Sequence, residues 1–74
     1  MSPRLDNSIR RLRFEHGEMS QQELADRVGA TRQTIIALEA NKYSPSLLLA
    51  VRIARVFDLN VEDVFQYTLS GKGQ

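Results

Sequence analysis

The chain has 74 residues, 42% of them hydrophobic and 26% charged, which is the composition of one small soluble globular domain. It contains no cysteine and one histidine, His16, which excludes disulfide bonds and thiolate metal sites and leaves little for a histidine-based active site. No apolar run approaches the ~20 residues of a membrane span and no signal-peptide pattern opens the chain, so we expect a cytoplasmic binding module rather than an enzyme or a membrane protein.

The net charge is only +1 at pH 7, but the charges are unevenly distributed. Residues 1–57 carry nine basic and six acidic side chains, whereas residues 58–74 carry one basic and three acidic side chains. A basic body is suited to contact with phosphate, and the acidic segment would then face elsewhere. Chance scatter of surface charge is the alternative interpretation of this pattern.

Apolar residues at every third or fourth position, together with capping residues, predict five helices. The second begins at the capping box Ser20-Gln21-Gln22-Glu23, in which the Ser20 hydroxyl and the Glu23 carboxylate satisfy each other's backbone N–H groups, and it stops at Gly29. The fourth is the most apolar and is expected to bury one continuous stripe. The stripe consists of Leu47, Ala50, Ile53, Ala54 and Phe57. The helices cover roughly residues 7–15, 20–29, 31–40, 47–57 and 61–65.

The residues after the fifth predicted helix have a different character. Gln66-Tyr67-Thr68-Leu69 alternates polar and apolar side chains and has high β-propensity, which favours a short strand. The polar end, residues 71–74, is expected to fray. The predicted fold is therefore all-α, a single five-helix domain over residues 1–74 with its core at 7–66 and one short C-terminal strand.

Only Gly29-Ala30-Thr31 separates the second helix from the third, and two short helices joined by such a turn form the helix-turn-helix signature. The tight turn lets the first helix cross a phosphate backbone while the start of the second enters the major groove of DNA. Arg32 and Gln33 stand at that start, and their side chains match the hydrogen-bonding edges of guanine and adenine. The alternative is that both are solvated surface residues of an ordinary helical hairpin.

The run from Ser20 to Gly29, followed by Thr31-Arg32-Gln33-Thr34-Ile35 and Leu38-Glu39, closely resembles the Cro/lambda-repressor (Xre-type) helix-turn-helix family. The similarity continues through Lys42–Leu47 to Val61–Phe65 and covers about residues 7–66. Within the family, the chain is most similar to stand-alone small regulators of the cytolysin-repressor type. The resemblance implies a lambda-repressor-like fold and a homodimer on an inverted-repeat operator in double-stranded DNA, usually acting as a repressor. We expect no cofactor, no metal and no small-molecule ligand.

Carried over position by position, the resemblance assigns base contacts to the third helix, and phosphate contacts chiefly to the start of the second helix and the loop after the third. Arg13 and Glu39 match the family's paired charges, which tie the first helix to the end of the third. An exposed ion pair of this kind contributes under ~1 kcal/mol, so its value would lie in orientation. The expected base contacts are Thr31, Arg32, Gln33 and Ala37. The expected phosphate contacts are Gln21, Thr34, Lys42 and Tyr43.

Several positions depart from the family pattern. The loop at residues 16–19 is one residue longer than usual, and Asn41 stands where glycine is common, so Asn41 is expected to adopt the left-handed conformation. Ala37 replaces a longer polar side chain and offers only apolar contact, for example to a thymine methyl group. Ile36 and Leu48 are apolar where the family is usually polar. They could join the groove surface and a protein contact respectively, or both could be isolated surface residues.

An apolar cluster near the end of the chain is large for so small a domain. We interpret it as a dimer interface, because a helix-turn-helix protein needs two-fold symmetry to read a palindrome; cover for the core is the alternative. The second candidate function is a protein-binding module of the same fold, an antitoxin or antirepressor, which would use this cluster and Leu48. His16 is interpreted as a loop residue rather than a metal ligand or pH sensor. The cluster consists of Leu59 and the predicted interface residues Val61, Val64, Phe65, Tyr67 and Leu69, with residues 66–70 as a dimerisation strand.

Overall fold

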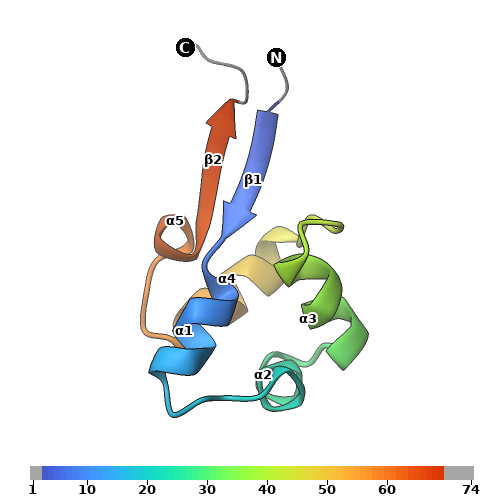
Figure 1. The fold of residues 1–74 in the computed structure, drawn as a ribbon, viewed down its shortest axis with the longest axis vertical. Helices are drawn as coiled ribbons and strands as arrows, with labels where there is room; N and C mark the ends of the chain where they lie inside the picture. The colour runs from blue at the N-terminus through green and yellow to red at the C-terminus, as the bar shows by residue number, and fades with distance from the viewer. Residues whose placement is uncertain (1–2, 70–74) are drawn as a thin grey trace.

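The computed structural model describes residues 3–69 of the chain. Five short helices form one body, and two strands extend from it side by side (Figure 1). The predicted frayed end, residues 71–74, lies outside the described residues, as does Ser70 of the predicted dimerisation strand. In chain order the elements are β1 (Pro3–Asn7), α1 (Ile9–Glu15), α2 (Gln21–Val28), α3 (Arg32–Glu39), α4 (Leu47–Val56), α5 (Val61–Val64) and β2 (Phe65–Leu69).

Hydroxyl side chains cap the starts of α2, α3 and α4, and the sequence predicts the first of these caps at Ser20. The Ser20 hydroxyl accepts the N–H of the third residue after it at 2.9 Å, and Thr31 and Ser46 make the same bond at 3.1 Å each. The predicted capping box at the start of α2 is only half formed. The Glu23 carboxylate pairs instead with Arg27, one turn further along α2, at 2.7 Å.

All five helices contribute to one core. Ala25 is fully buried on α2, and its small side chain lets α2 and α3 approach closely. The predicted stripe along α4 is buried from Ala50 to Phe57, but Leu47 is 76% exposed, so its place in the stripe was wrong. Leu47 is the first residue of α4 and stands clear of the elements that cover the rest of the stripe. The buried residues are Ile9, Leu12, Met19, Leu24, Ala25, Val28, Ile35, Leu38, Ala50, Ile53, Ala54, Phe57, Val64 and Phe65.

The structure contains one strand that the local sequence does not predict. β1 pairs antiparallel with β2, which confirms the predicted C-terminal strand, and Leu5 lies opposite Tyr67. Residues 3–7 include proline, aspartate and asparagine, which are depleted in strands, so the extended form of β1 depends on its pairing with β2. The fold is therefore mostly helical with a small sheet rather than all-α. The first helix begins at Ile9 and not at Asn7, because Asn7 ends β1.

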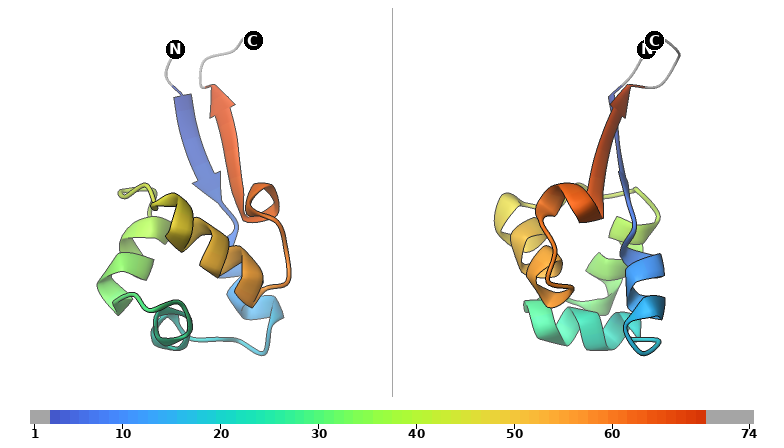
Figure 2. Two further views of the ribbon diagram at one scale, coloured as in Figure 1. Left: turned by 180° about the vertical axis from the view of Figure 1, so that it is seen from behind. Right: turned by 90° about the vertical axis from the view of Figure 1, so that its left-hand side faces the viewer.

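The strands and α2 lie at opposite ends of the molecule (Figure 2). α3 connects these two ends, because its first residue follows the turn from α2 and its last turn reaches the base of β1 (Figure 1). Asn7 at the end of β1 donates a hydrogen bond to the carbonyl of Leu38 in α3 at 2.8 Å. α3 is thus held at both ends while its outer side faces away from the body.

Replacing Ala25 with leucine will destabilise the protein by about 1–3 kcal/mol, because the added carbon atoms have no space between α2 and α3. Urea unfolding followed by circular dichroism measures the change. The control is Ala40→Leu, an exposed alanine directly after α3, which will shift stability by less than about 0.5 kcal/mol. Equal stabilities of the two variants would contradict close packing at Ala25.

Candidate nucleic-acid interface

A tight left-handed turn joins α2 to α3. Gly29 ends α2 with φ of 74°, a conformation that suits glycine because it has no Cβ. Ala30 then donates its N–H to the carbonyl of Ala25 at 2.9 Å, and Thr31 caps α3 directly afterwards. Because a backbone bond closes the turn and Ala25 is buried, the direction of α3 relative to α2 is set within the protein itself.

The first turn of α3 faces solvent. Arg32 and Gln33 are exposed there, while Ile35 and Leu38 on the inner side of the same helix are buried. Ala37 is half-buried, one turn after Gln33. The structure therefore places Arg32 and Gln33 together at the accessible end of a helix whose inner side is anchored in the core. A helix presented in this way can enter a groove without displacing core residues.

Two threonines share a hydrogen bond at the start of α3. The hydroxyl oxygens of Thr31 and Thr34 lie 3.0 Å apart, and Thr31 also accepts the backbone N–H of Thr34 at 3.1 Å. Only one of the two hydroxyl hydrogens is used within the pair. The other is available to an acceptor outside the protein, such as a phosphate oxygen or a base edge.

Arg13 on α1 forms hydrogen bonds with two other parts of the chain. Its Nε and Nη2 donate to the two carboxylate oxygens of Glu39, at the end of α3, at 2.6 and 3.0 Å. Its Nη1 donates to the carbonyl of Met19 at 2.7 Å. The Arg13 and Glu39 side chains are only 14% and 11% exposed, so the pair is a largely buried bidentate one rather than the exposed pair considered from the sequence.

This pair also orients Gln21, the first residue of α2. The Gln21 amide donates one N–H to the Glu39 carboxylate at 3.1 Å, which leaves its second N–H for another acceptor. Arg13 offsets the charge of Glu39, so the carboxylate does not present an unopposed negative charge beside Gln21. The position expected to contact phosphate is therefore held in one orientation at the start of α2.

The loop after α3 reverses direction at Asn41. Asn41 has φ of 59°, which confirms the left-handed conformation predicted for it. Its N–H donates to the Leu38 carbonyl at 3.0 Å, and the N–H of Lys42 donates to the Ala37 carbonyl at 2.9 Å. Lys42 and Tyr43 then follow as exposed side chains, with Tyr43 50% exposed. The predicted loop residues thus lie just beyond the end of α3 that is opposite Arg32.

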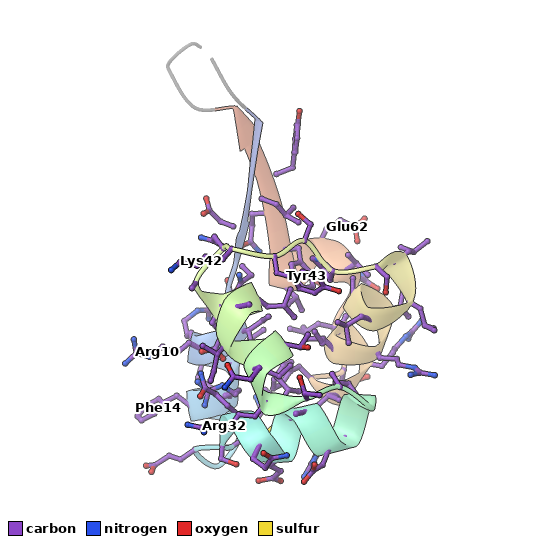
Figure 3. All side chains as sticks on the ribbon, turned by 90° about the vertical axis from the view of Figure 1, so that its right-hand side faces the viewer. Arg10, Phe14, Arg32, Lys42, Tyr43 and Glu62 are labelled. Atoms are coloured by element: carbon purple, nitrogen blue, oxygen red, sulfur yellow. The ribbon has the colours of Figure 1, made fainter. Side chains whose placement is uncertain are left out.

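Figure 3 shows Arg32 near the start of α3 and Lys42 beyond its end, with Arg10 and Phe14 of α1 extending to the same side in this view. Arg10 is exposed, and Phe14 is 68% exposed. Sequence reasoning did not select either residue for this side. The signal that could have found Arg10 is its spacing, because it precedes Arg13 by three positions and so shares its face of α1.

Two residues of the predicted dimer interface are buried within their own chain. Val64 and Phe65 are 0% and 7% exposed, so they offer little surface to a second copy. The single turn of α5 leads directly into β2, which turns these two side chains toward the other helices. Val61 is half-buried against the core, and Tyr67 is 68% exposed. The structure describes the backbone of Leu69 in β2 but not its side chain.

The other apolar and ionisable residues singled out from the sequence occupy ordinary surface or loop positions. Ile36 is half-buried, whereas Leu48 is 61% exposed. The Nδ1 atom of His16 lies 2.8 Å from the Leu12 carbonyl, and its ring meets Phe57 edge-on with centroids 5.0 Å apart. Within residues 3–69, no group of three or more His, Cys, Asp or Glu side chains could hold a metal ion, and no helix is long and apolar enough to cross a membrane.

The capped α2, the glycine turn and the exposed start of α3 together define a helix-turn-helix protein. The model of the helix-turn-helix family matches residues 9–64. The chain belongs to this family and is of the Cro/lambda-repressor (Xre) type, as its sequence resemblance predicts. This is a family of regulators rather than of enzymes.

Curated relatives cover most of the same region. A protein from Archaeoglobus fulgidus is 54% identical over 57 residues, which are 77% of this chain and 80% of the relative. One from Methanothermobacter thermautotrophicus is 60% identical over 58 residues, covering 77% and 83%. One from Bacillus subtilis is 46% identical over 61 residues, covering 82% and 91%. All three are named as uncharacterized helix-turn-helix-type transcriptional regulators.

A crystal structure of a candidate DNA-binding protein from Bacteroides fragilis has a similar fold. Its TM-score is 0.71 at 22% sequence identity, over 84% of this chain and 98% of that one. At this identity the likeness concerns the fold alone. The fold of most of this chain therefore also occurs in an experimentally determined structure.

Replacing Arg13 with alanine will destabilise the protein by about 1–3 kcal/mol, because Glu39 and the Met19 carbonyl then lose their donors in a largely buried position. Chemical unfolding measures the loss. Arg11→Ala is the matched control on the same helix, since Arg11 and Glu15 form an exposed pair at 3.4 Å whose loss changes stability by less than about 1 kcal/mol. A similar loss in both variants would show that the network around Glu39 contributes no more than a surface pair.

Proposed function

We propose that the protein is a sequence-specific transcriptional regulator that binds an inverted-repeat operator in double-stranded DNA as a homodimer. The observation that carries this proposal is the exposed first turn of α3, with Arg32 and Gln33 held outward by the buried contact between α2 and α3. A protein that occupies promoter DNA excludes polymerase from it, so repression in the cytoplasm is the proposed outcome. The relatives named as transcriptional regulators support the proposed regulatory function.

We infer that base recognition comes from the outer side of α3. The Arg32 guanidinium can donate to O6 and N7 of guanine together, and the Gln33 amide can pair with N6 and N7 of adenine. Thr31 adds one hydroxyl beside them, and Ala37 offers a methyl group for contact with thymine. Since Ala37 carries no polar atom, most of the discrimination between bases falls to Arg32 and Gln33.

We propose phosphate contacts near both ends of α3. Gln21 and Thr34 lie near the start of α2 and α3, and Lys42 and Tyr43 lie in the loop beyond the end of α3. The position of Arg10 on the same side of the molecule supports adding it to this set (Figure 3). Cationic contacts release counterions from DNA, so the affinity is expected to fall steeply as salt concentration rises.

We propose that the dimer uses the outer part of the sheet, which keeps Tyr67 from the interface predicted from the sequence and adds Leu5. Side chains two apart on a strand point to one face, so Leu5 shares a face with Asn7, and Tyr67 shares a face with Phe65. Near the helices this face is covered, with Phe65 buried, but further out Leu5 and Tyr67 are 37% and 68% exposed. A second copy could cover this outer part of the sheet and also supply the two-fold symmetry that an inverted repeat requires.

Arg32→Ala and Gln33→Ala will each weaken binding to the preferred operator by about 1–3 kcal/mol while changing non-specific binding much less. The operator is obtained by selection of random duplex DNA with the wild-type protein, and mobility shift at fixed salt measures the affinities. Selection is expected to return an inverted repeat with half-site centres about 10 base pairs apart.

Arg55→Ala is the control for this experiment, because it removes the same charge from an exposed position on α4. It will retain close to wild-type affinity for the operator. Equal losses for Arg32→Ala and Arg55→Ala would indicate a general charge effect and contradict base recognition by α3. Failure of the selection to enrich any sequence would contradict sequence-specific binding altogether.

Tyr67→Glu will shift the protein from dimer to monomer at micromolar concentration, because a charge would then lie in the outer part of the sheet that the second copy covers. Sedimentation equilibrium measures the mass. Phe14→Glu is the matched control, since Phe14 is also an aromatic residue that is 68% exposed but lies on α1, and this variant will remain dimeric. A wild-type protein that is monomeric in this range would rule out the proposed sheet interface in the absence of DNA.

A further inference from the structure

Asn7 at the end of β1 makes hydrogen bonds in two directions. Its side-chain oxygen accepts the N–H of Ile9 at 3.2 Å, which is a local contact at the start of α1. Its side-chain nitrogen donates to the Leu38 carbonyl at 2.8 Å and to Oδ1 of Asn41 at 3.0 Å, both more than thirty residues away in the chain. One side chain therefore ties the base of the sheet to the end of α3.

The partner of Asn7 is itself held from a second side. The amide nitrogen of Asn41 donates to Oδ1 of Asp6 at 3.2 Å, so the last two residues of β1 bind both ends of the Asn41 amide. Asn41 is the left-handed residue at which the loop turns, and Lys42 and Tyr43 follow it directly. The position of this loop thus depends on side chains from β1.

The carbonyl group of Leu38, in the last turn of α3, requires hydrogen-bond donors from outside the helix. The last carbonyl groups of a helix have no partner within the helix. Leu38 receives the N–H of Asn41 at 3.0 Å and the Asn7 amide at 2.8 Å, so both of its lone pairs are used. These bonds connect the last turn of α3 to the end of β1.

We propose that Asn7, together with Asn41, is a positioning residue of the DNA interface. It couples α3, the helix proposed to contact the bases, to the sheet formed by β1 and β2. This inference rests on the proposed function, which places base recognition on α3 and the dimer contact on the sheet. If both are correct, the bonds from Asn7 set the position of each α3 relative to the dimer axis. They therefore set the separation between half-sites that the dimer accepts, although Asn7 itself touches no base.

Two substitutions separate this role from simple support of the fold. Asn7→Asp keeps an oxygen for the Ile9 N–H but loses the N–H groups that reach Leu38 and Asn41. Asn41→Gly removes the bridging amide, while glycine adopts the left-handed conformation at that position without strain. Neither change removes buried apolar volume, so both variants are expected to fold, and Asn41→Gly is expected to melt no lower than wild type.

The experiment compares binding to the operator selected by the wild-type protein with binding to the same operator carrying one extra base pair between its half-sites. Wild type will strongly prefer the original spacing. In Asn7→Asp and Asn41→Gly, affinity for the original operator will fall about five-fold or more, the effect of one lost hydrogen bond, and the preference for its spacing will shrink. Ser8→Ala is the control, because Ser8 adjoins Asn7 but its hydroxyl bonds Gln66 at 3.4 Å and not α3.

A second measurement needs no DNA. Hydrogen exchange at the backbone amides of Asn41 and Lys42 will accelerate in Asn7→Asp, while exchange at core amides of α4 stays unchanged. The proposal would be overturned if these two amides exchanged as slowly in Asn7→Asp as in wild type. It would also be overturned if both variants folded and kept the wild-type preference for the original spacing. If wild type itself binds no duplex DNA, the proposed function fails, and the exchange result still decides whether Asn7 holds the end of α3.

Discussion

Arg13 and Glu39 form a bidentate ion pair that is largely withdrawn from water, and three helices take their relative positions from it. Arg13 belongs to α1, Glu39 ends α3, and Gln21 at the start of α2 donates to the same carboxylate. An arginine fork and a carboxylate have matching planar geometry, so the pair restricts orientation as well as distance. Together with the glycine turn and the buried Ala25, this set of bonds fixes the positions of α2 and α3, on which any groove contact depends.

The same end of α3 is also held by a second set of bonds of different chemistry. There the Asn7 amide at the end of β1 makes neutral hydrogen bonds to the Leu38 carbonyl and the Asn41 side chain, and the Asp6 carboxylate accepts one more from Asn41. Neutral bonds of this kind contribute modestly to stability but are directional. α3 is therefore anchored by an ion pair at Glu39 and by amides at its adjoining turn, and its first turn remains exposed. The exposed residues can vary without disturbing either anchor.

The helices were predictable because their signals are local. Ser20, Thr31 and Ser46 cap the helices that follow them, and Gly29 ends α2, so neighbouring residues alone determine these boundaries. The left-handed turn at Asn41 was predictable from the family resemblance, because glycine is common at that position. Arg32 and Gln33 could be placed on an exposed face because Ile35 and Leu38, at helical spacing from each other, mark the buried face of α3, and Arg32 and Gln33 lie at its start, off that face.

Contacts between distant residues were not predictable in this way. β1 has a sequence that disfavours strands, and only β2, sixty residues later, makes it extended. Burial of Val64 and Phe65, exposure of Leu47 and the bonds made by Asn7 likewise depend on which elements pack together. The sequence by itself determined the five helices, their caps and the family. The tertiary structure decided which apolar residues remain exposed and what holds the end of α3, because burial and long-range hydrogen bonds are properties of packing and not of local order.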